Sequence, residues 1–233
     1  MDIPVKIYYR RNARNFIARL NSDGSVRVTA PYGVAPERQQ EIIADLVRKV
    51  REKAVILPGP CYTEGMTLEC DGLTFRFRST DVSSAMLKAS ISRTDNHAEA
   101  VIEIPATLDT ADRSVQKRIS DLMVKVAANA GKRPLLEQAA AVSRRTGASP
   151  AAWKIGHGRR TLGTCHADRT ITLSALLVFL PAELKEYIIC HELAHLTEMN
   201  HSVRFHRLCD HYLGGREKQL AKAIKCHRWP ILR

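Results

Sequence analysis

Two histidines four residues apart, His191 and His195, limit what this chain can fold into more than any other feature of its sequence. On an α-helix this spacing places both imidazoles on one face, one turn apart, where they can reach a single metal ion. The apolar residues at helical spacing in this segment are Leu184, Ile188, Leu193 and Leu196. They predict a buried helix, whose histidines need polar partners, and a shared metal ion is the expected one. The alternative is a surface helix whose histidines bond to neighbouring groups.

Glu192 follows the first histidine directly and completes the sequence H-E-x-x-H, the arrangement found in zinc hydrolases. Its carboxylate projects about 100° around the helix from His191, so it can reach a water molecule on the metal without binding the ion. Three protein ligands leave one position of a tetrahedral zinc ion open for that water, whereas four would close the site. We therefore expect one zinc ion, Glu192 as the catalytic general base, and a third ligand elsewhere in the chain.

The third ligand has to come from a segment beyond the helix. A continuous helix would carry residue 201 about 15 Å along its axis from the first histidine, too far to share an ion. We expect the chain to reverse at Met199–Asn200, because asparagine tolerates the left-handed conformation. His201 is then the expected ligand, and His206 and His211 are the alternatives. His206 or Arg204 is also a candidate to stabilise the negative charge that develops on a reacting carbonyl oxygen.

The charge of the chain is strongly basic. Its 233 residues carry a formal net charge of +12, which attracts polyanions such as nucleic acid. The basic residues are spread along the whole sequence, and the densest spots near possible functional surface are Arg10–Arg11 and Arg159–Arg160. A nucleic-acid-binding surface and an ordinary solvated basic surface are therefore both open as interpretations.

The apolar segments are too short to cross a membrane. The longest apolar run, residues 175–180, ends at Pro181, and no apolar segment of the signal-peptide type follows Met1. Six cysteines without a C-x-x-C pair are expected to be reduced thiols, and Cys190 is expected to be a small buried apolar residue. We therefore expect a soluble, cytoplasmic protein with no membrane partner, and the oligomeric state stays open.

The first part of the chain has the pattern of paired strands. Turn signals at residues 21–24, 71–72 and 95–96 separate segments rich in strand-forming residues. The expected strands are residues 16–20, 26–30, 66–70, 73–77, 86–92 and 98–104. A helix is expected to begin at Pro36 and to end before Pro58–Gly59–Pro60. We therefore predict an antiparallel β-rich lobe with one helix, residues 1–110.

Residues 111–233 have mainly helical periodicity and form the second predicted domain. The expected helices, besides the one with the metal motif, are residues 114–130 with Gly131 as the stop, 134–146, 203–213 and 217–227. The expected short strands are residues 153–155, 161–165 and 170–173, with a turn at Asp168–Arg169. A strand beside the metal helix can hold an extended peptide at its edge, or it can serve only as cover. The fold class is α+β.

The residues around the metal motif also resemble those of a known family. The residues that carry this resemblance are Ile171–Ser174, Pro181, Tyr187–Leu196, Asn200–Ser202 and Phe205. They are similar to the YgjP-like metallopeptidase family, which is related to the SprT and WLM zinc peptidases. The resemblance is strong over residues 134–213 and weaker in the first hairpin. It implies a small zincin-like catalytic domain with His191, His195 and His201 as zinc ligands and Glu192 as the catalytic residue.

Two positions depart from the family pattern. Leu162–Cys165 stands where the family usually has Trp-Gly-Ser-Cys, and His206 stands where it has tryptophan. Neither change removes a ligand or the base, so both concern the substrate pocket.

The expected function is zinc-dependent hydrolysis of a peptide bond in a peptide or protein substrate. One alternative is a basic protein associated with nucleic acid, or an SprT-like protease that acts on proteins bound to nucleic acid. Another is a metal-dependent hydrolase of a small substrate such as a nucleotide. The sequence has no glycine-rich phosphate-binding loop, which counts against the last alternative.

Overall fold

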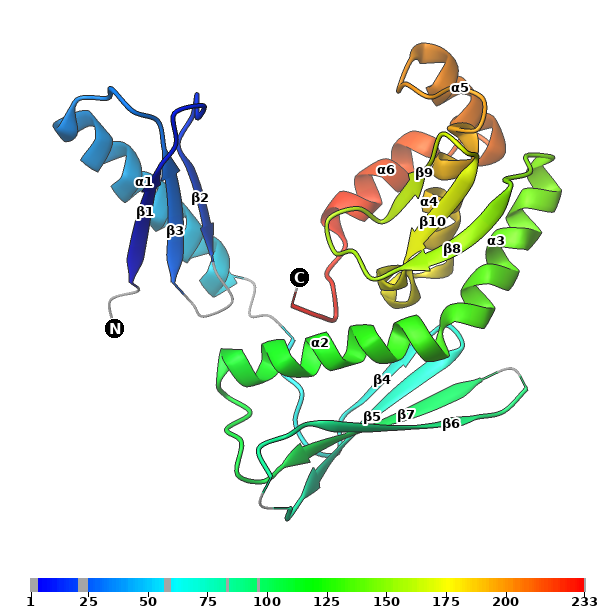
Figure 1. Cartoon of the computed structure of the whole chain (residues 1–233), viewed down its shortest axis with the longest axis horizontal. Helices are drawn as coiled ribbons and strands as arrows, with labels where there is room; N and C mark the ends of the chain where they lie inside the picture. The colour runs from blue at the N-terminus through cyan, green and yellow to red at the C-terminus, as the bar shows by residue number, and fades with distance from the viewer. Residues whose placement is uncertain (1–3, 21–24, 57–59, 83, 96, 233) are drawn as a thin grey trace. The chain divides into compact units, whose positions relative to one another are not determined.

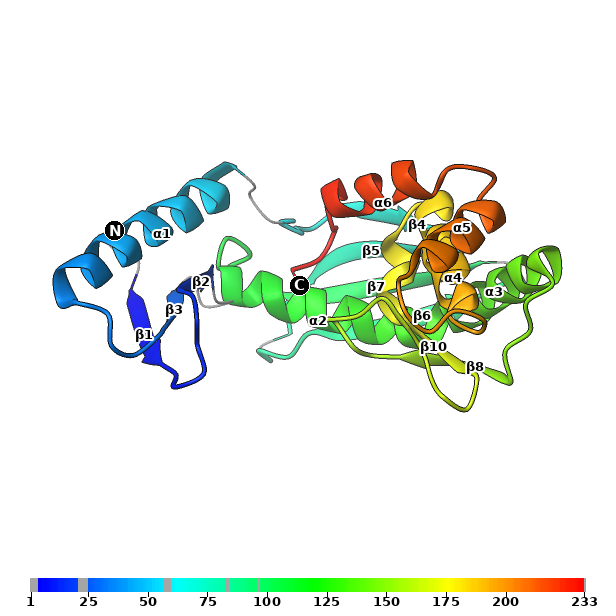
Figure 2. The same cartoon turned by 90° about the horizontal axis from the view of Figure 1, so that it is seen from above.

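The computed structural model describes residues 4–20, 25–56, 60–82, 84–95 and 97–232 (Figure 1, Figure 2). The chain forms two compact units. The first contains residues 1–61, 109–117 and 232, and the second contains residues 62–108, 118–231 and 233. The fold is α+β, as the sequence predicts. The predicted division into domains at residue 110 stays a prediction.

The first unit is a three-stranded sheet with one helix. Its elements are β1 (Val5–Tyr9), β2 (Ile17–Leu20), β3 (Val26–Ala30) and α1 (Pro36–Ile56). The antiparallel pairing of β2 with β3 confirms the first predicted hairpin, although its turn, residues 21–24, lies outside the described residues, as do residues 57–59. The strand β1, which was not predicted, pairs parallel with β3. The prediction of an entirely antiparallel lobe is therefore wrong for this pair. Val26 and Val28 of β3 are fully buried against Ile43 and Val47 of α1.

The second unit begins with a four-stranded sheet. Its strands are β4 (Thr67–Cys70), β5 (Leu73–Thr80), β6 (Lys88–Arg93) and β7 (Ala98–Pro105), in the order β4-β5-β7-β6. The antiparallel pairs β4–β5 and β6–β7 confirm the two further hairpins. Gly72 has φ +74°, as the predicted two-residue turn requires, and Asn96 of the other turn lies outside the described residues. The central pair β5–β7 is parallel, so here too the prediction of a wholly antiparallel arrangement is corrected.

Two helices follow, α2 (Arg113–Ala130) and α3 (Lys132–Thr146). Gly147 ends α3 in the left-handed conformation, with φ 71°, as predicted. Gly131 separates the helices for a different reason than the one expected. It has φ −84° in the right-handed region, and a Cβ atom there would lie 2.5 Å from Cγ2 of Val178. This glycine is therefore required by close packing rather than by backbone conformation.

The remaining elements form a second sheet and a group of helices. They are β8 (Ala152–Gly156), β9 (Gly163–Cys165), β10 (Thr170–Ser174), the 3₁₀ turn η1 (Ala175–Phe179), α4 (Ala182–Ala194), α5 (Val203–Tyr212) and α6 (Glu217–Cys226). The central strand β10 pairs parallel with β8 and antiparallel with β9, so β9 is an edge strand. Arg169 has φ 63° at the predicted turn before β10. None of the helices in the described ranges combines the length and apolar character that a membrane crossing requires.

The helix with the histidine motif, α4, is held from two directions. Ile189 and Leu193 are fully buried in a core shared with Leu173 of β10 and Phe205 of α5. Lys185, whose side chain is 4% exposed, donates to Asp71 in the β4–β5 turn, with 2.7 Å between Nζ and Oδ2. Because its apolar face and the ion pair of the buried Lys185 fix α4, side chains at its C-terminal end start from a rigid base.

Candidate metal centre

The last turn of α4 carries His191 and Glu192, and His195 directly follows the last helical residue, Ala194. The helix therefore ends before Met199–Asn200, where we expected the reversal. Backbone bonds of the tighter i to i+3 type, from Leu196 to Leu193 and from Thr197 to Ala194, close the helix end. The chain does bend at 199–200, but among the described non-glycine residues a positive φ occurs at Arg169 and not at Asn200.

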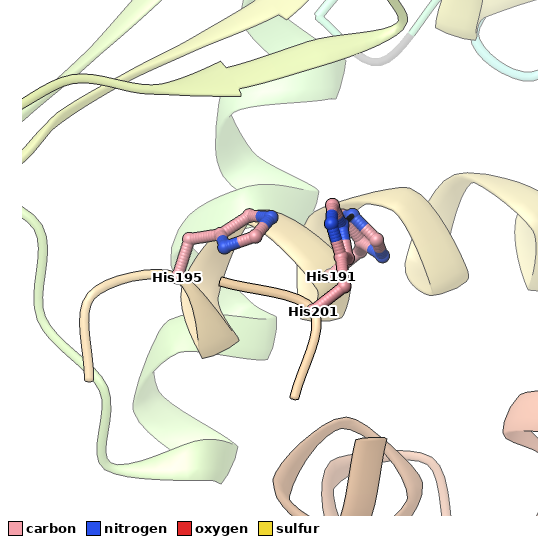
Figure 3. Close-up of side chains that lie close together, drawn as sticks. All are labelled: His191, His195 and His201. Carbon is pink, nitrogen blue, oxygen red and sulfur yellow. Dashed lines mark hydrogen bonds between the residues drawn. The ribbon is translucent and has the colours of Figure 1, made fainter. Parts of the chain in front are cut away.

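The bend returns His201 to the two histidines at the helix end, so three imidazoles lie together. His191, His195 and His201 each offer one nitrogen, and these nitrogens lie within 4.8 Å of one another. In Figure 3 the ring of His195 is directed towards the neighbouring rings of His191 and His201. The Nε2 atoms of His191 and His201 are 3.0 Å apart. Two nitrogens bound to one tetrahedral zinc ion at about 2.05 Å would be about 3.3 Å apart, so only a small adjustment separates this pair from zinc-binding geometry.

The orientation of His195 is set by the turn that follows the helix. Its Nδ1 lies 3.1 Å from the carbonyl oxygen of Glu198. A carbonyl only accepts hydrogen bonds, so Nδ1 carries the proton and Nε2 has a free lone pair. A histidine held in this way is prepared to bind a cation through Nε2.

The ring of Phe205 packs against the rings of all three histidines. Its side chain is fully buried, and its ring centroid lies 4.8, 4.5 and 4.7 Å from the ring centroids of His191, His195 and His201. The N-terminus of α5 places this ring, because the hydroxyl of Ser202 accepts a hydrogen bond from the backbone N–H of Phe205. The same cap fixes the backbone directly after His201.

Burial keeps the paired histidines of the helix end neutral. Burial, together with smaller effects of the neighbouring His195 and His201, lowers the pKa of His191 to about 4. Burial also lowers the pKa of His195 below its ordinary value. Neutral imidazole is the form that binds a metal ion, so at neutral pH protons do not compete strongly for these two nitrogens.

Glu192 lies against the edge strand β9. Its side chain is buried, and burial raises its pKa to about 7, with a smaller opposing effect of a hydrogen bond from the backbone of Cys165. A Cβ atom on Gly163 would lie 2.5 Å from both Cγ and Oε1 of Glu192. The absence of a side chain at Gly163 therefore makes room for the carboxylate. Sequence reasoning missed this role, although a glycine inside a short strand is a known sign of close approach.

The other candidate residues lie outside the three-histidine group. Nδ1 of His206 lies 3.0 Å from Oε1 of Glu217 on α6. His211 is exposed beside the ring of Tyr212, and Arg204 is an exposed residue of the first turn of α5. Cys190 is fully buried, as predicted for a small apolar residue. The geometry thus favours His201 over His206 and His211 as the third ligand.

Comparisons with known proteins give one structure and one family. The crystal structure of the metallopeptidase zymogen abylysin from Pyrococcus abyssi is 24% identical over 40% of this chain and 92% of that chain, with a TM-score of 0.36. None of the curated proteins matches. The model of the YgjP-like metallopeptidase domain matches residues 14–223, a range that contains the three histidines and Glu192. By this match over most of its length, the chain belongs to the YgjP-like metallopeptidase family.

Proposed function

We propose that this protein is a zinc-dependent metallopeptidase in which His191, His195 and His201 hold one zinc ion. The observation that carries the proposal is the meeting of three imidazole nitrogens within 4.8 Å of one another. Imidazole is a common zinc ligand, and the group contains no carboxylate oxygen of the kind that magnesium and calcium prefer. A set of three ligands also leaves a coordination position open, which is typical of catalytic rather than structural zinc.

Glu192 supplies the proton transfers in this proposal. A zinc ion in the site would acidify a water molecule and polarise a peptide carbonyl, the two effects that peptide hydrolysis needs. The Glu192 carboxylate accepts the proton of the attacking water and later gives it to the leaving amine. Burial raises the pKa of Glu192 above its ordinary value, which suits both tasks, because a base with a pKa nearer neutrality accepts and releases a proton readily.

The edge strand β9 is the proposed binding place for an extended substrate. It lies at the end of the order β8-β10-β9, and one of its residues, Gly163, touches the side chain of Glu192. The outer side of an edge strand offers backbone groups that an added peptide strand can pair with. A substrate bound there would pass next to the catalytic carboxylate.

Metal analysis tests the ligand set. We expect one zinc per chain in the wild-type protein after reconstitution, loss of that zinc in His201→Ala, and full zinc content in the matched variant His206→Ala. Loss of zinc in His206→Ala with retention in His201→Ala would contradict the assignment, as would a wild-type protein that binds no zinc.

Glu192→Gln tests the reaction. The neutral amide cannot act as a base, so we expect peptide hydrolysis to fall by about 10²–10⁴-fold while zinc content stays unchanged. A panel of protein substrates and nucleoside triphosphates, assayed in parallel, separates proteolysis from the small-substrate alternative. Hydrolysis of nucleotides without hydrolysis of any protein would reject the peptidase assignment and keep the metal site.

A further inference from the structure

We infer that the open face of the β1-β3-β2 sheet binds single-stranded RNA. This inference concerns the first unit alone and is independent of the metal centre. Side chains alternate between the two faces of a strand, and residues paired across strands share a face. The register pairs Lys6 and Arg19 with Arg27, and it pairs Tyr8 and Ile17 with Thr29. Two rows of side chains therefore cross one face of the sheet. We call this face the basic face; its residues are Lys6, Tyr8, Ile17, Arg19, Arg27 and Thr29.

The helix α1 packs on the opposite face, against β3 and β2, and leaves the basic face open. Val26 and Val28, which alternate with Arg27, are fully buried against α1. Figure 1 shows α1 behind the three strands, and Figure 2 shows the same helix on one side of them. Arg27 is exposed, and Tyr8 and Ile17 are 43% and 48% exposed. The surface is therefore available to a partner.

The first row consists of three cations side by side. Lys6, Arg27 and Arg19 come from β1, β3 and β2, and all three are exposed. Neighbouring strands lie about 4.8 Å apart, so the backbone positions of the three cations span about 10 Å. Like charges directly opposite each other destabilise a sheet. No acidic side chain stands in either row of the described strands, so a bound polyanion is the partner that would relieve this repulsion.

Tyr8 of the second row and Arg27 of the first row together supply a surface on which bases can stack. The guanidinium carbon of Arg27 lies 4.3 Å from the ring centroid of Tyr8, so a ring and a planar cation form one platform. Unpaired bases stack on tyrosine rings and on arginine planes, whereas the bases of a duplex are already stacked on each other. Cations beside a stacking platform thus fit a single strand. Thr29, between Tyr8 and Ile17, brings a hydroxyl that can bond to a ribose 2′-OH, which selects RNA.

Fluorescence anisotropy of the full-length protein with a labelled 15-nucleotide oligouridine tests the inference. Three cations predict a slope of about −2 in log affinity against log salt, which is about a 20-fold loss between 50 and 200 mM salt. We expect Tyr8→Ala to weaken binding about five-fold or more, and Tyr8→Phe to retain it because the ring remains. Arg19→Ala should make the slope shallower by about 0.7. The matched control Arg48→Ala changes an exposed, ion-paired arginine of α1 and should leave binding unchanged.

Several results would overturn the inference. One is the absence of oligouridine binding at 50 mM salt, and another is an equal effect of Arg48→Ala and Arg19→Ala. Equal or tighter binding of the matching oligothymidine would contradict the preference for RNA over DNA. Tighter binding of a duplex would contradict the preference for a single strand. Equal binding of oligoglutamate would reduce the basic face to a general anion surface. Circular dichroism of each variant shows whether a loss of binding follows from unfolding, and Tyr8→Phe provides the decisive comparison in that case.

Discussion

Gly163 and Glu192 depend on each other at the candidate metal centre. The missing side chain of the glycine provides the space that the carboxylate occupies, since a Cβ atom would lie 2.5 Å from Oε1. The contact is with the reactive end of a buried side chain, so a methyl group there displaces the proposed base. The candidate metal ligands come from α4 and the segment after it, and a change on β9 leaves them in place.

Gly163→Ala should therefore separate zinc binding from catalysis. We expect hydrolysis to fall by about ten- to a hundred-fold, with full zinc content, because the misplaced carboxylate loses its alignment with the water. Overpacking should also cost about 1–3 kcal/mol of unfolding free energy. Activity, zinc content and chemical denaturation measure the three effects. Gly158→Ala is the control, because a Cβ atom there meets nothing within 4 Å. Wild-type activity in Gly163→Ala would contradict this account.

The buried carboxylate should also make the metal-free protein less stable as the pH rises. The pKa of Glu192 is raised from 4.5 to about 7, so its favourable contribution is complete below pH 4.5 and is lost as the pH passes 7. In the presence of a chelator, Glu192→Gln should therefore stabilise the protein at pH 8, by up to about 3 kcal/mol, and have little effect at pH 4.5. Thermal melts at both pH values measure this difference. Glu69→Gln, at an exposed position, should show none, and an equal effect of Glu192→Gln at both pH values would contradict the prediction.

The site residues that the sequence identifies lie on one helix or shortly after it. His191, Glu192 and His195 are related by helical spacing alone, and the need for a third ligand points to His201. Gly163 contacts Glu192 across a distance of 29 positions in the sequence, and no local pattern shows which strand lies against which helix. In the sequence, Phe205 stands out only through the family resemblance, because its contact with the histidine rings exists only in the folded chain.

At the scale of elements, local pairing was predictable and distant pairing was not. The three hairpins follow from turn residues between alternating segments, and all three are antiparallel as predicted. The pairs β1–β3 and β5–β7 join strands that are not neighbours in sequence, and both are parallel. Parallel pairs need crossover connections, and a turn signal carries no information about them.

The end of α4 shows the same limit. The sequence correctly requires a reversal before His201, but its position depends on contacts that the helix makes after folding. The helix ends at Ala194, and the carbonyl of Glu198 then bonds to the ring of His195. Through this hydrogen bond the backbone of the turn holds the ring of a candidate ligand in place. The side chains of the turn do not reveal this role in the sequence.

At the scale of the whole molecule, the two compact units should respond differently to metal. The three histidines belong to the second unit, and a ligand that binds only the folded form stabilises the unit that holds it. Trp153 and Trp229 also belong to this unit, and they are the two tryptophans of the chain. Tryptophan fluorescence therefore follows the unfolding of the second unit alone, whereas circular dichroism follows both.

Removal of zinc should shift only the transition that the tryptophans report. At a free zinc concentration of about a thousand times Kd, the metal adds about 4 kcal/mol to the unfolding free energy of the second unit. Thermal melts with zinc and with chelator, followed by fluorescence and circular dichroism, measure the shift. His201→Ala should melt at the same temperature in both conditions, because its site lacks one ligand. A wild-type fluorescence transition insensitive to zinc would contradict the proposed site, and an equal shift in His201→Ala would place the zinc elsewhere.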